Sequence, residues 1–227
     1  SREGRPGPVP AGIDSRIYAL SPGNAAFLDR LGAWTSIPEA LRTPVHAMRV
    51  FGDDGASQIE FDAYRTGCAE LAWIVEDRQL QAALWRALEG QDGLTLFPGA
   101  SLQDLRVGDR QASLLLDGGP GIEARLVVGA DGAQSFVRRR AGIACDERPY
   151  GQTAVVANFE CAKPHRNVAY QWFAGGAVLA LLPLPGDHVS MVWSVDAAQA
   201  ARLLALDGGA LARDVAASAQ GALGELS

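Results

Sequence analysis

The stretch LVVGADGAQSFVR, residues 126–138, decides the fold that this sequence predicts. Its first three residues, Leu126 to Val128, indicate a buried strand, and Gly129-Ala130-Asp131-Gly132 indicates a tight turn at the carboxyl end of that strand. A short helix is expected from about Ser135 to Ala141. Asp131 would then lie in a glycine-flanked turn whose backbone can approach a ligand, just before a helix amino terminus that favours phosphate. The alternative from the residues alone is a plain strand–turn–helix in which Asp131 is the N-cap.

Outward from this motif, helix and strand signals are mixed. Residues 1–13 are expected to form a loop. Ser21 should cap a helix that starts at Pro22, ends before Gly32 and buries Phe27, Leu28 and Leu31. A second helix is predicted at 76–89 and a helical tail at 197–223. Strands are predicted at 45–51, 70–75, 94–97, 112–116 and 122–128, with a hairpin turn at 52–55 and an antiparallel sheet over 153–195 that the strands at 45–51 and 59–62 join. The pattern predicts an α/β (α+β) protein with a cofactor layer and an antiparallel substrate layer.

Composition narrows the classes of function. The 227 residues carry a net charge of −6, and 48% are hydrophobic, which suits a packed globular protein and disfavours nucleic-acid binding. No apolar run reaches the length of about 18 residues that a membrane-spanning helix needs. Three cysteines and three histidines are scattered, so no metal site is expected, and reduced thiols in the cytoplasm are predicted. No nucleophile motif occurs, so no side chain is assigned a catalytic role.

The pattern G-A-D-G-x-x-S-x-V-R, beginning at Gly129, is similar to the "DG" motif of flavoprotein monooxygenases. The resemblance implies that Gly129, Asp131 and Gly132 lie near the FAD pyrophosphate and take part in the use of NAD(P)H.

Two further stretches resemble the ubiquinone-biosynthesis hydroxylases. DSRIYALS at 14–21, followed by LDRLGAW at 28–34, implies that Arg16 lies beside the flavin, with Tyr18 and Ala19 near its ring. IVEDRQL at 74–80 implies that Arg78 reaches a FAD phosphate. Because a helix amino terminus disfavours a cation, an anionic partner for Arg78 is expected, and a salt bridge to Glu76 or Asp77 is the alternative.

A fourth stretch carries the resemblance into the sheet. YQWFAGG at 170–176, ALLPLP at 180–185 and VWS at 192–194 are similar to the part of those hydroxylases that lines the aromatic pocket, which implies substrate contacts for Gln171, Phe173 and Leu182. Strand alternation places Gln171 and Phe173 on one face and Tyr170 and Trp172 on the other. The alternative is that both faces are ordinary core.

Taken together, the resemblance implies hydroxylation of a phenol ring, expected to be polyprenylated, with FAD as cofactor, NAD(P)H as reductant and dioxygen as co-substrate. Contact with the inner membrane surface is expected without an anchor, because such a substrate dissolves there. Residues 1–44 and 71–150 are predicted to be part of a FAD-binding domain, and 45–70 and 151–227 a substrate domain.

The family opens with a strand–GxGxxG–helix unit and closes with a G-D-A-A-H segment, and neither is found in this sequence. The chain is therefore expected to match the middle of such an enzyme, to bind FAD weakly or not at all and to be inactive alone. Two alternatives stay open: a non-enzymatic domain that binds a hydrophobic ligand, and another flavin enzyme of the same fold, a reductase or a halogenase. The W-x-W-x-I-P segment usual in halogenases does not occur.

Overall fold

The computed structural model describes residues 5–227, and the chain divides into two compact units. We call Pro8–Gly90 with Tyr150–Ser227 the sheet unit, and Gln91–Pro149 with the residues before Pro8 the DG unit. Residues 5–13 contain neither helix nor strand, as predicted for this loop, and the rest of the predicted loop, 1–4, lies outside the described residues.

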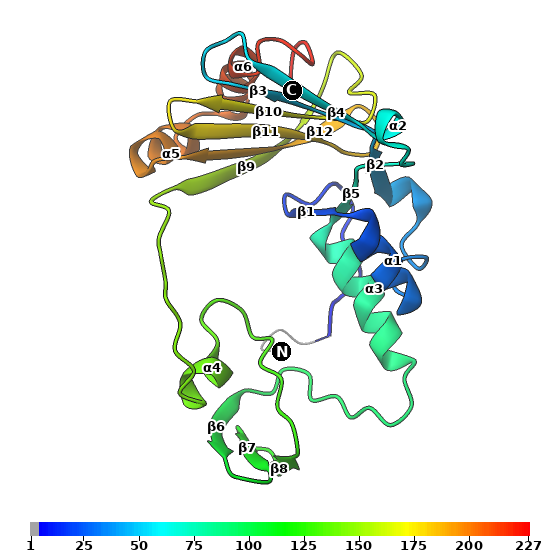
Figure 1. Ribbon diagram of the computed structural model, residues 1–227, viewed down its shortest axis with the longest axis vertical. Coiled ribbons are helices and arrows are strands. Elements are labelled where there is room, and N and C mark those ends of the chain that lie inside the picture. The colour runs from blue at the N-terminus through cyan, green and yellow to red at the C-terminus, as the bar shows by residue number, and fades with distance from the viewer. Residues whose placement is uncertain (1–4) are drawn as a thin grey trace. The chain divides into compact units, whose positions relative to one another are not determined.

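The centre of the sheet unit is a six-stranded sheet in the order β4-β3-β10-β11-β12-β9 (Figure 1). Its strands are β3 (Ala47–Phe51), β4 (Gln58–Asp62), β9 (Thr153–Glu160), β10 (Val168–Ala174), β11 (Ala177–Pro183) and β12 (His188–Val195). The predicted strands at 45–51 and 59–62 do join the 153–195 sheet. The prediction that the sheet is antiparallel is wrong at one pair, because β3 runs parallel to β10, and the sheet is therefore mixed.

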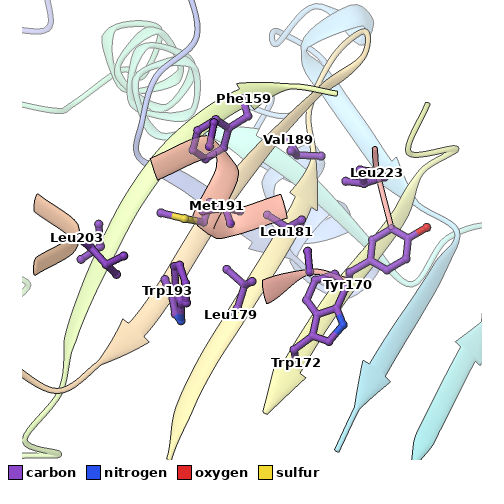
Figure 2. Close-up of a cluster of buried hydrophobic side chains, with 14 of the residues drawn as sticks. Phe159, Tyr170, Trp172, Leu179, Leu181, Val189, Met191, Trp193, Leu203 and Leu223 are labelled. Atoms are coloured by element: carbon purple, nitrogen blue, oxygen red, sulfur yellow. The ribbon is translucent and has the colours of Figure 1, made fainter. Parts of the chain in front are cut away.

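One face of this sheet forms the main core. Tyr170, Trp172 and Met191 point into it, and α5 (Ala197–Leu204) and α6 (Gly208–Ser218) cover it. Figure 2 shows Leu203 of α5 beside the sheet residues. The Phe51 ring stacks on Trp172 with centroids 5.3 Å apart. This face owes its stability to burial of apolar area, as the alternating pattern of the strands predicts.

A smaller antiparallel sheet of the same unit has the order β1-β5-β2, with β1 (Ile17–Leu20), β5 (Ala72–Glu76) and β2 (Arg42–Val45). Ile13 and Ile17 pack with Leu182 and Ala169 of the large sheet. The segment that leads into β1 therefore covers part of the face opposite α5 and α6, an arrangement that Figure 1 shows.

Helices α1 (Pro22–Arg30) and α3 (Asp77–Glu89) pack on the small sheet; the shorter elements are a 3-10 helix at Glu39–Leu41 and α2 (Ala63–Thr66). Ser21 caps α1 as predicted, because its Oγ accepts from the Asn24 N–H at 3.2 Å. The predicted buried stripe is wrong except for Leu28. Phe27 is 52% and Leu31 42% exposed, while Ala25 is buried beside Leu28. The Arg30 guanidinium covers the Phe27 ring instead, with its carbon 5.7 Å from the ring centroid.

The DG unit holds an antiparallel sheet, β6-β7-β8, and the helix α4 (Phe136–Arg140). Its strands are β6 (Leu102–Val107), which the sequence analysis missed, β7 (Ala112–Leu116) and β8 (Gly121–Ala124). No strand forms at 94–97, and the buried strand predicted at Leu126–Val128 is wrong, since Leu126 is 78% and Val128 77% exposed. The strand ends at Ala124 because no described strand pairs with the backbone beyond that residue, and an unpaired strand gains no ladder hydrogen bonds.

Candidate cofactor and substrate sites

Arg16, Tyr18 and Ala19 lie at the start of β1 and along it. Tyr18 is opposite Val75, and Ala19 is opposite Ile74, in the antiparallel pairing with β5. The Arg16 side chain is exposed, and its guanidinium carbon is 5.8 Å from the centre of the Tyr18 ring. Among the described residues this guanidinium has no carboxylate partner, so it is a cation free to meet an anionic or aromatic ligand.

Arg78 is already paired within the chain. Its Nε and Nη2 donate to the Glu76 carboxylate at 2.8 and 2.7 Å, and Nη2 also donates to the Gly12 carbonyl. Glu76 is only 4% exposed. The salt bridge to Glu76, left open by the sequence, is therefore present, and it neutralises the cation at the start of α3. The Asp77 N–H donates to the Arg16 carbonyl at 2.9 Å, so the structure brings the two arginine segments together.

Asp131 caps the short helix that follows it. Its carboxylate accepts from the Ser135 hydroxyl and from the Phe136 and Val137 N–H groups, the last two at 2.6 and 3.1 Å. The Ser135 hydrogen bond, followed by that of the Val137 N–H, lowers the pKa of Asp131 to about 2. The helix-capping interpretation of Asp131 thus describes its contacts within the DG unit, and the carboxylate stays ionised at neutral pH.

The two glycines of the motif are needed for different reasons. Gly132 has φ +82°, and a Cβ there would meet no atom within 4 Å, so the backbone of the turn is open to a ligand. A Cβ on Gly129 would lie 2.8 Å from two carbons of Val137, so Gly129 is required by packing against α4. Only Gly132 leaves space of the kind that a phosphate would need.

A cavity of about 380 Å³ in the DG unit was not foreseen from the sequence. Gly129, Ser135 and Arg138 of the DG motif line one side of it, and Leu105 and Ala112 line another. The cavity depends on β6, which the sequence analysis did not identify, and no sequence signal announces it.

The three predicted substrate residues share one face of the six-stranded sheet. Gln171 and Leu182 are half-buried, and Phe173 is 43% exposed. Tyr170 and Trp172 point to the opposite face and are buried, which confirms the predicted alternation. Because Leu182 packs with Ile13 and Ile17, the face that carries Phe173 is also the face toward which the Arg16 segment lies.

Two searches of the described residues found no candidate. No helix among residues 5–227 is long and apolar enough to cross a membrane. Within the same residues, no group of three His, Cys, Asp or Glu side chains is placed to hold a metal ion.

Comparison with known proteins shows homology over most of the chain. It is 34% identical over 180 residues to the 3-demethoxyubiquinol 3-hydroxylase of Escherichia coli K12, a match of 79% of this chain and 46% of the relative. It is 34% identical over 196 residues to the ubiquinone hydroxylase UbiL of Rhodospirillum rubrum, covering 86% of this chain and 45% of that one. The chain thus spans a little less than half the length of these relatives. No family model matches the chain.

Solved structures share the fold. The complex of Pseudomonas aeruginosa PqsL with 2-aminobenzoylacetate has a TM-score of 0.76 at 21% identity, over 99% of this chain and 64% of PqsL. Klebsiella pneumoniae HpxO complexed with FAD has a TM-score of 0.64 at 18% identity, over 89% of this chain and 53% of HpxO. Over most of its length, the chain is therefore a homologue of the ubiquinone-biosynthesis hydroxylases and has the fold of part of a FAD-dependent monooxygenase.

Proposed function

We propose that the polypeptide carrying this chain is a FAD-dependent hydroxylase of ubiquinone biosynthesis. It would add one oxygen atom from dioxygen to the ring of a polyprenylated phenol, with NAD(P)H as reductant. The observation that carries the proposal is the 34% identity to two ubiquinone hydroxylases over 79% and 86% of the chain. The aromatic ligand of PqsL and the FAD of HpxO, both on the same fold, support it.

The residues of the chain fit FAD in part. The unpaired Arg16 guanidinium beside Tyr18 suits an electron-rich ring system or an anion, and the open turn at Gly132 suits a phosphate. Arg78 fits less well, since Glu76 already takes its charge. We therefore assign Arg16, Tyr18, Ala19 and Gly132 to direct contact with FAD. Arg78, Gly129 and Asp131 would shape the backbone around it.

The protein's own part in the reaction is binding and orientation. FAD, when bound, supplies the reduction of dioxygen and the oxygen transfer. Phe173 would pack on the substrate ring, Gln171 would hydrogen-bond a ring oxygen, and Leu182 would line the inner end of the pocket. Each CH₂ of a prenyl tail buried on this apolar face would contribute about 0.8 kcal/mol. Uptake of such a substrate would bring the protein to the membrane surface.

The division of labour along the chain follows from these roles. Residues 1–44 and 71–150 would serve the cofactor, and residues 45–70 and 151–227 would serve the substrate. The packing of Ile13 and Ile17 on Leu182 supports the idea that both groups of residues meet at one face of the large sheet.

The test is a Phe173→Asp variant of the full-length polypeptide, assayed for hydroxylation of a prenylated phenol. A charge on the apolar face should lower kcat/KM at least about tenfold, since a buried unpaired carboxylate costs more than the 1.4 kcal/mol that this factor represents. Leu204→Asp is the matched control, because Leu204 is 71% exposed on α5, which packs on the other face of the sheet. Unchanged activity in Phe173→Asp would overturn the pocket. A wild-type protein that hydroxylates no phenol would overturn the function itself.

A further inference from the structure

A buried polar network holds the segment Gly12–Arg16 in place. The Glu76 carboxylate accepts from the Asp14 N–H at 2.9 Å as well as from Arg78. The Asp14 carboxylate in turn accepts from the N–H groups of Arg16 and Arg78, at 3.0 and 3.4 Å. Together with the bond from Arg78 to the Gly12 carbonyl, these contacts satisfy backbone groups that no helix or strand satisfies.

Asn158 ties this network to the other sheet. Its Nδ2 donates to the Asp14 carbonyl at 2.9 Å, across a separation of 144 residues. Asn158 lies on β9, opposite Ser190 of β12, on the face that also carries Leu182 and Phe173. The Asn158 Oδ1 and the Ser190 Oγ are buried without a hydrogen-bond partner among the described residues. The bond to Asp14 is therefore the one printed contact that orients the Asn158 amide.

The segment needs such a tether because its own sequence gives it little structure. Prolines and glycines dominate residues 6–12, Gly12 has φ +92°, and neither helix nor strand forms before Ile17. Only side chains from β5, α3 and β9 determine where residues 12–16 lie, and hence where the exposed Arg16 guanidinium is presented.

We infer that Asn158 and Glu76 are positioning residues, which act through Asp14 to hold Arg16 at a set place beside the substrate face. The inference rests on the proposed function for the role of Arg16. Glu76 holds the Asp14 backbone from the small sheet, and Asn158 holds it from the large sheet. The network thereby couples the element that presents the cation to the sheet that carries Gln171 and Phe173.

The first experiment needs no cofactor. Hydrogen exchange is measured on the 227-residue chain and on its Asn158→Asp and Asn158→Leu variants. Both remove the donor to Asp14, and Leu adds no charge. The amides of Asp14 and Arg16 should exchange about tenfold faster, the factor expected when about 1.4 kcal/mol of local stability is lost. Ser190→Ala is the matched control, because it alters the neighbouring buried side chain, which makes no hydrogen bond. Unchanged exchange in both Asn158 variants would overturn the tether, whatever the function of the protein.

The second experiment separates positioning from general stability in the full-length polypeptide. The FAD dissociation constant is measured for Arg16→Gln, Asn158→Leu and the double variant. If Asn158 acts through Arg16, the single variants each weaken FAD binding about tenfold and the double variant is no weaker than Arg16→Gln alone, because coupled sites are not additive. Additive losses would overturn the inference. Glu76→Gln, paired with Arg16→Gln in the same way, supplies an independent cycle if the Asn158 variants do not fold. Wild-type protein that binds no FAD would refute the proposed function, while the exchange result would still decide the tether.

Discussion

Asp131 makes three hydrogen bonds through its carboxylate, all to residues at the start of α4. Each is stronger to the ionised acid than to the protonated acid, and for this reason the pKa falls from 3.8 to about 2. A depressed folded-state pKa contributes stability that is fully present above the unfolded pKa and is lost as pH falls through the folded one. We expect the carboxyl group to titrate by NMR near pH 2 and the first turn of α4 to loosen between about pH 4 and 2.

The matching substitution is Asp131→Ala. Loss of the cap should speed the hydrogen exchange of the Phe136 and Val137 amides while leaving the sheet unit unchanged. Asp146→Ala is the control, because Asp146 pairs only with the exposed Arg148 in the same unit. Equal exchange at Phe136 in the two variants would contradict the assigned cap. In the full-length polypeptide we further expect Asp131→Ala to slow flavin reduction by NAD(P)H.

Strand β10 shows how one element serves two purposes. Trp172 is 4% exposed and stacks between Phe51 and Tyr170, whereas the next residue, Phe173, is 43% exposed on the opposite face. Trp172→Ala should therefore destabilise the chain by about 3–5 kcal/mol, and Phe173→Ala by less than about 1 kcal/mol. Urea unfolding followed by circular dichroism measures both. Similar losses in the two variants would mean that Phe173 belongs to the core.

At the scale of the whole chain, the expected outcome for FAD is weak binding or none. The 227 residues contain no G-x-G-x-x-G after a strand, the element that holds the ADP part of such cofactors. The DG unit also buries few large apolar side chains, Leu105 being one, and exposes Leu126 and Val128. We predict that the purified 227-residue chain is colourless, with full-length polypeptide as the positive control. A stoichiometric flavin absorbance in the short chain would contradict this.

The sequence by itself determined those features whose cause is local. Ser21 and Pro22 begin α1 and Gly32 follows it, because capping and a left-handed φ of +70° depend on neighbouring residues. The two-residue period of 170–173 settled which side chains share a face. The resemblance placed Arg16 and Tyr18 at one site, and β1 and β5 bring them beside Arg78.

Only the tertiary structure decided the features that depend on distant partners. Whether Phe27 or Ala25 faces inward depends on where α1 meets β5. Whether Leu126–Val128 forms a strand depends on a neighbouring strand to pair with. The parallel pairing of β3 with β10, and the tether from Asn158 to Asp14, join residues more than 100 positions apart. No local pattern specifies such partners, because the free energy of a pair is gained only when the fold brings both of its members together.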